Sequence, residues 1–310
     1  MLVLFLLVGL LQSVVAHERV FLPQQPISSA KYDNEFPQFS PDSRHIIFAS
    51  TRDDADYDIY TINVDGSGTR RLTHSPGRDA HPYYLPSGKQ VVFQSPRDHD
   101  NEREVELYSM KPDGKAQHRL IARDGFNGVA VPSRDGKKIA YMRGTWNDAN
   151  KNFHWELFLI DSDGTHEQQL TNNAWNSQVA SWFPGDREIA FYANPGGRDQ
   201  LFVLNLESGS VRKLLVSDAN DHAPSVSPDG KRVAFTSDRD SDSDLYVLEL
   251  SSRKIQRLTT NATVRGQPGW SHDGRHIVFA GASTGVYEVY TIRTDGSELK
   301  RLTHGTEGAR

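Results

Sequence analysis

The sequence contains no cysteine among its 310 residues, so disulfide bonds and thiolate metal sites are excluded. It also lacks a run of charge of either sign, because the net charge is −5 and charged residues are scattered along the chain. A nucleic-acid surface needs a clustered basic stripe, so we expect no nucleic-acid partner. Beyond the N-terminus there is no long apolar run, and we expect no membrane span in the mature chain.

The N-terminus carries the features of an export signal. Residues 1–11 are almost wholly apolar, and Val14, Val15 and Ala16 form a small-residue cleavage site. We therefore predict a cleavable signal peptide over residues 1–16 and a secreted or periplasmic mature protein. No basic residue precedes the apolar run, which leaves a retained membrane anchor as the alternative.

A repeated pattern organises the rest of the chain. Residues 227–235 read Ser-Pro-Asp-Gly-Lys-Arg-Val-Ala-Phe, followed by Asp-Leu-Tyr at 244–246 and Arg-Leu-Thr at 257–259. Near copies begin at Ser40 and Ser271, and looser copies bring the number of units to six. The aromatic residues that end the second strand of each unit lie 44 to 50 residues apart: Phe48, Phe93, Tyr141, Phe191, Phe235 and Phe279. A period in the forties with four β segments per unit is typical of a β-propeller.

The turn chemistry within each unit supports this prediction. The Ser-Pro-Asp-Gly string forms a tight turn, since proline presets the first dihedral of the turn and Asp or Gly tolerates the dihedrals of its later positions. Asp-Gly pairs close a later hairpin in four of the units: Asp65-Gly66, Asp113-Gly114, Asp163-Gly164 and Asp295-Gly296. The strands alternate and no segment keeps a helical period.

We therefore predict an all-β, six-bladed β-propeller with four antiparallel strands per blade over residues 36–304. A leader over residues 17–35 precedes it and can add one rim strand at Val20–Leu22, and residues 305–310 form a tail. Each unit holds its own four strands, so the ring is expected to close by packing the first blade on the sixth.

The repeated motif resembles the TolB-type propeller repeat over nearly all of the mature chain. TolB is a periplasmic protein that binds other envelope proteins, and similar repeats occur in prolyl oligopeptidase-like peptidases and oligogalacturonate lyases. TolB carries an α/β domain ahead of its propeller, and the peptidases need a hydrolase domain. The leader is too short for the α/β domain of TolB, and no hydrolase domain follows Arg310, so we expect a stand-alone exported propeller.

Residues ahead of each innermost strand ring the channel mouth of a propeller, where ligands usually bind. The candidates for binding are Glu35, His81, Gln178, His222, Arg265 and Gln267. Imidazole and amide groups suit a divalent metal. The resemblance to oligogalacturonate lyases implies a His/Gln metal cluster, and His81, Gln178, His222 and Gln267 would supply it. Those lyases resemble a seven-bladed ring, whereas this chain has six units.

A structural interpretation of the mouth residues competes with the ligand-binding and metal-binding interpretations. Asp79 and Asp221 each lie three residues before a proline, where a carboxylate can tie neighbouring blades by accepting backbone N–H groups. His81 and His222 lie at non-equivalent offsets from these prolines, so they need not point the same way.

Two loops carry further candidates. The third unit has a longer loop over residues 143–153 with Trp146, and such variation between repeats usually builds a binding face. Asp240, Asp242 and Asp244 could form a loose calcium site, although an acidic solvated hairpin loop is the favoured interpretation.

These observations predict an exported, monomeric, non-catalytic binding or scaffold module. It would recognise a protein of the envelope or extracellular space, or a small ligand, at the channel mouth and the Trp146 loop. No cofactor is expected. The alternative is a metal-assisted lyase or hydrolase acting on an acidic sugar or lactone, with His81, His222 and Gln267 as metal candidates.

Overall fold

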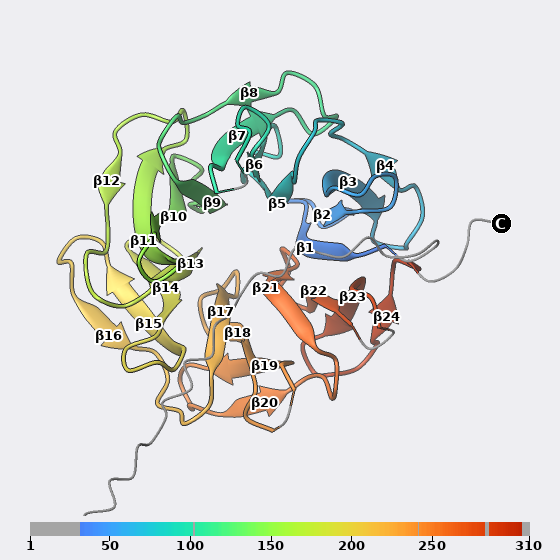
Figure 1. The fold of residues 1–310 in the computed structure, drawn as a ribbon. Coiled ribbons are helices and arrows are strands. Elements are labelled where there is room, and N and C mark those ends of the chain that lie inside the picture. The colour runs from blue at the N-terminus through green and yellow to red at the C-terminus, as the bar shows by residue number, and fades with distance from the viewer. Residues whose placement is uncertain (1–31, 102, 241, 283–284, 306–310) are drawn as a thin grey trace, which may run out of the picture.

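Six four-stranded sheets surround a central channel (Figure 1). The computed structural model describes residues 32–305, apart from residues 102, 241 and 283–284. The all-β, six-bladed prediction is confirmed, and every blade has four antiparallel strands. The predicted signal peptide, the rim strand at Val20–Leu22 and residues 306–310 lie outside the described residues. Within the described part of the chain, no helix is long and apolar enough to cross a membrane.

The first three blades follow the chain in order. The first consists of β1 (Asn34–Phe39), β2 (His45–Ser50), β3 (Asp58–Asn63) and β4 (Arg70–Arg71). The second consists of β5 (Ala80–Tyr84), β6 (Val91–Ser95), β7 (Glu106–Met110) and β8 (His118–Arg119). The third consists of β9 (Phe126–Pro132), β10 (Lys138–Asn147), β11 (Asn152–Asp161) and β12 (Gln168–Gln169).

The last three blades repeat the arrangement. The fourth consists of β13 (Gln178–Trp182), β14 (Glu188–Ala193), β15 (Gln200–Asn205) and β16 (Val211–Lys213). The fifth consists of β17 (Asp221–Val226), β18 (Arg232–Ser237), β19 (Asp244–Glu249) and β20 (Ile255–Arg257). The sixth consists of β21 (Val264–Trp270), β22 (His276–Gly281), β23 (Glu288–Arg293) and β24 (Lys300–Arg301).

One backbone hydrogen bond recurs at every junction between blades. A residue at or next to the start of an innermost strand donates its N–H to a carbonyl of the preceding blade, which lies just before the third strand or, at Trp155, within it. Asn34 donates to Tyr287 at 2.8 Å and so joins the first blade to the sixth. The same bond joins the other pairs: Asp79 to Tyr57, Asn127 to Val105, Ser177 to Trp155, Asp221 to Asp199 and Val264 to Ser243. Since each blade keeps its own consecutive strands, the ring closes by packing, as expected.

The bond made by Asn34 also shows that the propeller begins earlier than the sequence predicted. The prediction placed Asn34 and Glu35 in the leader, whereas the structure places both in β1. The repeat motif begins with the aromatic residues of the inner strand, so it gave no signal for the preceding polar residues that join one blade to the next.

The Arg-Leu-Thr motif fastens the outer strand to the third strand of the same blade. In the fifth blade, the Thr259 hydroxyl accepts the N–H of Leu245 at 2.9 Å and donates to the Asp244 carboxylate at 2.8 Å. The first, third and sixth blades make the same pair of bonds through Thr73, Thr171 and Thr303. The threonine therefore satisfies a buried backbone donor and a buried carboxylate at once.

The Asp-Gly turns have a second function besides closing a hairpin. Gly114, at φ +86°, lies against the backbone of Leu72, the leucine of the Arg-Leu-Thr motif in the preceding blade. Gly164 lies in the same way against Leu120, and Gly66 lies near Leu302 across the junction that closes the ring. Two of the repeated motifs thus contact each other between blades.

The acidic loops after the second strands supply hydrogen-bond acceptors for tyrosines of the core. Phe235 and Tyr246 stack with their ring centroids 5.8 Å apart, and the Tyr246 hydroxyl donates to Asp240 at 2.8 Å. Tyr60 and Tyr108 donate to Asp53 and Asp98 in the same way. Asp240 and Asp244, which we considered as calcium ligands, are thus engaged by Tyr246, Thr259 and Arg257. These contacts favour the structural interpretation of the loop.

Arg134 joins three blades at the end of the channel opposite the starts of the inner strands. It donates from Nε to the carbonyl of Trp182 and from Nη2 to the carbonyls of Val226 and Ser227, each at 3.0 Å. Burial lowers the pKa of Arg134, against the opposing effect of Asp186 and Asp229. Hydrogen bonds to a charged donor are the stronger kind, so Arg134 ties these blades together at this end.

Candidate functional site

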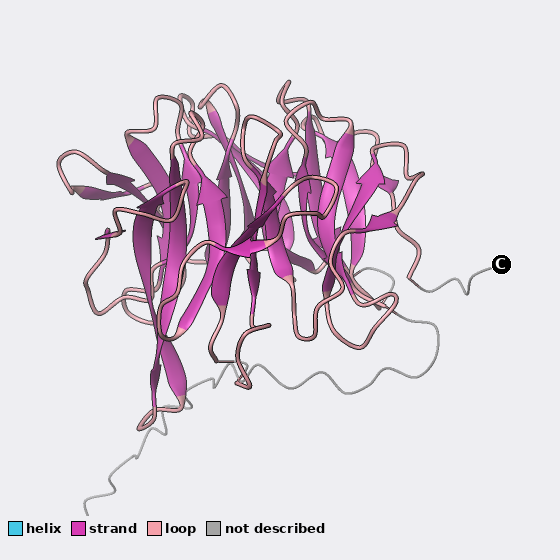
Figure 2. Ribbon diagram, turned by 90° about the horizontal axis from the view of Figure 1, so that it is seen from above, coloured by secondary structure: helices cyan, strands magenta, loops and turns pink. Residues whose placement is uncertain are grey.

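The innermost strands begin on one face of the ring, which we call the mouth face. The connections between second and third strands lie on this face too, and the β10–β11 hairpin, whose two strands have ten residues each, projects beyond the other blades (Figure 2). Each inner strand also has a register shift shortly after its start. Such bulges redirect side chains and are frequent next to binding sites.

Glu35 lies at the centre of a charged cluster in the mouth. Its side chain is fully buried, with Oε1 3.0 Å from Nη1 of Arg265 and Oε2 3.4 Å from Nη2 of Arg78. Burial raises the pKa of Glu35, although Arg265 and Arg78 act in the opposite direction. About a third of each arginine side chain is exposed, at 33% for Arg265 and 36% for Arg78. We name Glu35, Arg78 and Arg265 the mouth cluster.

Aromatic rings hold the two arginines in place. The guanidinium of Arg78 lies 4.4 Å from the ring centre of Tyr57, and that of Arg265 lies 5.3 Å from the ring centre of Tyr287. The His81 ring stacks on Phe36, with centroids 3.7 Å apart. Burial, and then the positive charges of Arg78 and Arg265, hold the pKa of His81 well below its usual value. His81 is therefore a neutral imidazole at pH 7.

A polar network crosses the channel between blades. The Gln267 side chain accepts the Tyr83 hydroxyl and donates to the carbonyl of Pro224. Gln38 donates to the backbone carbonyl of Gln267 at 3.2 Å and to the Tyr83 hydroxyl at 3.3 Å. This network joins side chains or carbonyls of the first, second, fifth and sixth blades. Gln267 is thus a structural bridge, with 6% of its surface exposed.

A local insertion places Gln267 in this bridge. Three residues, 266–268, separate the paired positions Arg265 and Gly269 of β21, whereas two separate Glu35 and Gln38 in β1. The additional residue was visible in the sequence as a longer inner segment of the sixth unit. Tyr83 and Gln38 gave no such signal and were missed.

The remaining mouth candidates form a separate group. His222 Nδ1 lies 3.7 Å from Asp199, and its ring centre lies 6.1 Å from that of Tyr192. The Tyr192 hydroxyl donates to Gln178 at 2.9 Å. The described residues contain no group of three or more His, Cys, Asp or Glu side chains placed to hold a metal. Two of the four candidate ligands, Gln178 and Gln267, are amides, so the His/Gln metal cluster stays a prediction.

Asp79 and Asp221 have a structural role that differs from the expected one. Their side chains bond to Arg97 at 2.7 Å and Arg239 at 2.8 Å, each within the same blade. The contact with the preceding blade is made by their backbone N–H instead. The expectation that these carboxylates bind backbone N–H groups of a turn does not describe these contacts.

Trp146 lies near the tip of the projecting hairpin. Its ring is 5.0 Å from that of Phe153 and lies 3.9 Å from the guanidinium of Arg103, with Nε1 donating to Asp148 at 3.0 Å. Phe153 in turn contacts Trp155 at 4.9 Å. All three rings are partly exposed, so this hairpin presents an aromatic surface on the mouth face. The sequence predicted a loop here, whereas the structure forms two ten-residue strands.

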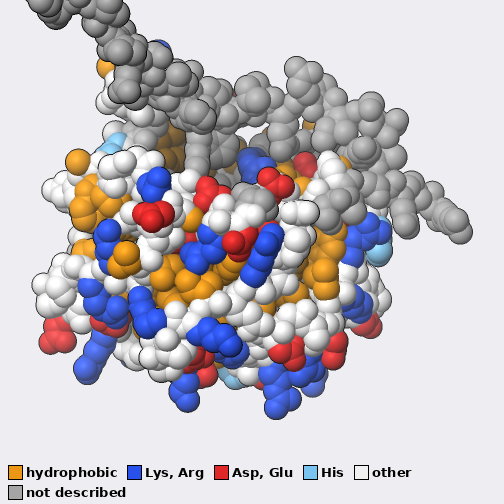
Figure 3. All heavy atoms as spheres, turned by 90° about the horizontal axis from the view of Figure 1, so that it is seen from below, with side chains coloured by type: hydrophobic (Ala, Val, Ile, Leu, Met, Phe, Trp, Pro, Cys, Tyr) orange, Lys and Arg blue, Asp and Glu red, His pale blue; other side chains and the backbone are white. Residues whose placement is uncertain are grey.

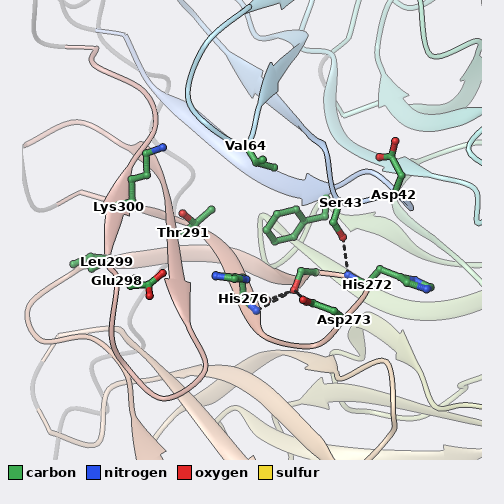
Figure 4. A pocket seen from close by; sticks show the side chains of 12 residues that line it. Asp42, Ser43, Val64, His272, Asp273, His276, Thr291, Glu298, Leu299 and Lys300 are labelled. Carbon is green, nitrogen blue, oxygen red and sulfur yellow. Dashed lines mark hydrogen bonds between the residues drawn. The ribbon is translucent and has the colours of Figure 1, made fainter.

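A shallow groove of about 610 Å³ lies between the first and sixth blades (Figure 4). It is lined by turns of the face opposite the mouth, among them Ser43, which accepts the N–H of His272 at 2.8 Å. Val64 and Leu299 contribute exposed apolar surface, with 58% of Leu299 exposed. On the side of the molecule shown in Figure 3, positive and negative side chains are interspersed, as the scattered charges predicted. Because the residues that line it lie on the face opposite the mouth, the groove is distinct from the mouth cluster.

The ring of six four-stranded blades, the Gln267 bridge between blades and the charged mouth cluster define a six-bladed β-propeller. A family model described as the TolB beta propeller domain matches residues 22–154 and 146–309. The chain therefore belongs to the TolB β-propeller family, as its repeats predicted.

Three known proteins illustrate the range of similarity. An uncharacterized protein of Agrobacterium fabrum is 30% identical over 158 residues, which cover 49% of this chain and 52% of that protein. The structure of TolB from Acinetobacter baumannii superposes with a TM-score of 0.70 at 18% identity, covering 87% of this chain and 62% of TolB. The structure of an oligogalacturonate lyase in complex with manganese superposes with a TM-score of 0.60 at 14% identity, covering 88% of this chain and 77% of the lyase. This chain spans about half the length of the curated relative, and the two structural likenesses show the fold alone.

Proposed function

We propose that this propeller is an exported, non-catalytic binding module that recognises its partner at the mouth face. The carrying observation is that Arg78 and Arg265 are partly exposed in the mouth of a channel bridged by Gln267 and Tyr83. A ligand that approaches this opening meets guanidinium groups and a polar bridge. Concave sites with a few placed polar groups are the usual form of a ligand site.

The pairing of buried carboxylates with arginines on this face supports a binding role. Glu35, Asp79 and Asp221 are buried, and each is within 3.4 Å of at least one arginine. A carboxylate held in this way orders the arginine beside it, so less side-chain freedom is lost when that arginine binds a ligand. The projecting aromatic hairpin adds a second contact area on the same face, since exposed Trp and Phe often anchor protein partners.

The test requires a partner and matched variants of the full chain. The tagged protein would be cross-linked in the cells that produce it, each captured protein purified, and its dissociation constant measured by calorimetry. We expect Arg265→Met and Trp146→Ala each to weaken binding at least about tenfold, because truncation of such anchors costs about 2 kcal/mol. Leu299→Ala, on the opposite face, is the control and should bind as the wild type does. Loss of binding in the control, with both mouth-face variants unaffected, would contradict the proposal.

The alternative is a metal-assisted lyase or hydrolase, and it predicts a different result. Elemental mass spectrometry of protein purified without chelator would report a stoichiometric transition metal that disappears in the His81→Ala/His222→Ala double variant. We expect less than about 0.1 metal per chain in both proteins, because His81 stacks on Phe36 and the described residues group no three His, Cys, Asp or Glu side chains for a metal. A full equivalent of metal dependent on these histidines would favour the enzyme.

A further inference from the structure

The mouth cluster has more hydrogen-bond donors than its own residues satisfy. A guanidinium carries five N–H donors. Nε of Arg78 is buried and has no hydrogen-bond partner, and its Nη2 contact with Glu35 is long at 3.4 Å. A buried donor without an acceptor is costly, so an additional acceptor beside Arg78 would be favourable.

The charges around Glu35 come from several elements. Arg265 belongs to β21, and Arg78 and Tyr57 lie in the segments before β5 and β3. Asp33, just before β1, adds a negative charge, and its Oδ1 accepts the N–H of Tyr287 at 2.8 Å. With both carboxylates ionised, the two arginines are balanced in charge, and Glu35 is the acid that contacts them both.

We propose that the mouth cluster binds a carboxylate group of the ligand between Arg78 and Arg265, and that Glu35 is the internal anion which competes with this carboxylate. The inference rests on the proposed function and names the chemistry that its site would recognise. Bidentate arginine–carboxylate pairing provides both strength and orientation. Since the Arg78 and Arg265 side chains both contact one carboxylate already, they are placed to share a second one from the exposed side.

This arrangement makes anion binding sensitive to pH. Burial raises the pKa of Glu35, so the residue takes up a proton at a higher pH than an exposed glutamate does. Once protonated, it no longer neutralises the two arginines, and the ligand carboxylate gains their full attraction. Affinity for a carboxylate is therefore expected to rise as pH falls from 7.5 through the pKa of Glu35.

The experiment uses small probes on the full chain, with binding measured by ligand-observed NMR titration. Acetyl-triglycine carries a peptide carboxylate and glucuronate a sugar carboxylate, while acetyl-triglycine amide and glucose are their neutral counterparts. We expect at least one carboxylate to bind and neither neutral counterpart to do so, and the better of the two identifies the source. Arg265→Met and Arg78→Met should each weaken binding at least about tenfold, as expected for a lost charge-assisted bond.

Glu35→Gln provides the decisive variant because its effect has the opposite sign. It removes the competing charge and keeps the shape, so carboxylate affinity at pH 7.5 should rise about tenfold and lose its pH dependence. Arg275→Met removes one positive charge, as Arg265→Met does, at a side chain 74% exposed on the opposite face; it is the control for the arginine variants and should leave binding unchanged. Circular dichroism would confirm folding, and if Arg78→Met does not fold, Arg265→Met and Glu35→Gln still decide the question.

Unchanged or weaker binding in folded Glu35→Gln, or equal binding of the neutral probes, would overturn the inference. These results are separable from a failure of the proposed function. Partner binding that depends on Trp146 but not on the arginines would keep the binding module and remove its carboxylate site. Carboxylate binding without a partner that depends on the mouth face would leave the site and remove the module.

Discussion

Gly114→Ala is expected to lower the free energy of unfolding by at least about 3 kcal/mol. A Cβ at this position would overlap the carbonyl oxygen of Leu72 in the preceding blade and lie 3.1 Å from its Cα. The neighbour is backbone rather than a flexible side chain, so one blade must move relative to the next. The backbone at φ +86° adds the strain of a left-handed residue. Urea unfolding monitored by tryptophan fluorescence would measure the change.

Gly185→Ala is the matched control for this substitution. Gly185 has nearly the same dihedral, at φ +87°, yet a Cβ there would meet no atom within 4 Å. The control should therefore lose only the conformational cost, about 1 kcal/mol. Equal losses in the two variants would show that the junction between blades yields easily, contrary to the prediction.

Asp244→Asn is expected to destabilise the protein by about 3–5 kcal/mol at pH 7, and Asp58→Asn by much less. The two residues begin equivalent strands. Both oxygens of Asp244 accept two hydrogen bonds each, from Thr259 and Arg257 and from the N–H groups of residues 261 and 262. An asparagine amide would turn a donor toward two of these donors. Asp58 accepts bonds only from Arg71 and Thr73 among the contacts of its carboxylate in the described structure.

The pH dependence of the two substitutions should differ in sign. Burial raises the pKa of Asp58 to about 6 despite Arg71 and Thr73, so the folded protein binds its proton more tightly than the unfolded chain does. As pH falls from 7 through 6 toward 4, Asp58 stabilises the fold and the cost of Asp58→Asn grows. Although burial opposes it, hydrogen bonding lowers the pKa of Asp244, so its contribution is present above pH 4 and is lost at lower pH. Thermal unfolding of both variants from about pH 2.5 to 8 would test this, and parallel profiles would contradict it.

The sequence predicted the repeating parts of the molecule well because each repeat reports contacts within its own blade. The second-strand aromatics, the Asp-Gly turns and the Arg-Leu-Thr motifs all occur where the pattern placed them. The pattern could not show that Gly114 lies on Leu72, since this contact depends on how one blade turns against the next. Contacts between blades are a property of the closed ring.

The candidate site was predicted only in part for the same reason. Glu35 and Arg265 lie at the mouth, as expected. Arg78, which pairs with Glu35 as Arg265 does, has no counterpart in the repeat. In the sequence, the signal available for Arg78 was its position directly before Asp79. Gln267, which we predicted as a ligand, forms a bridge to Tyr83 that the repeat did not predict, because one additional residue in β21 carries it there. A site formed by departures from a repeat is poorly predicted by the repeat itself.

The hydrogen bond that recurs at all junctions has a consequence for the order in which the protein assembles. Asn127 and Val105 lie 22 residues apart, whereas Asn34 and Tyr287, which make the same bond, lie 253 residues apart. Bringing the distant pair together costs about 2 kcal/mol more in chain entropy, from the logarithmic dependence on loop length. Neighbouring blades can therefore dock as soon as each is formed, while the junction between the sixth and first blades forms last. The mouth cluster spans that junction, so the binding site is completed only when the ring is.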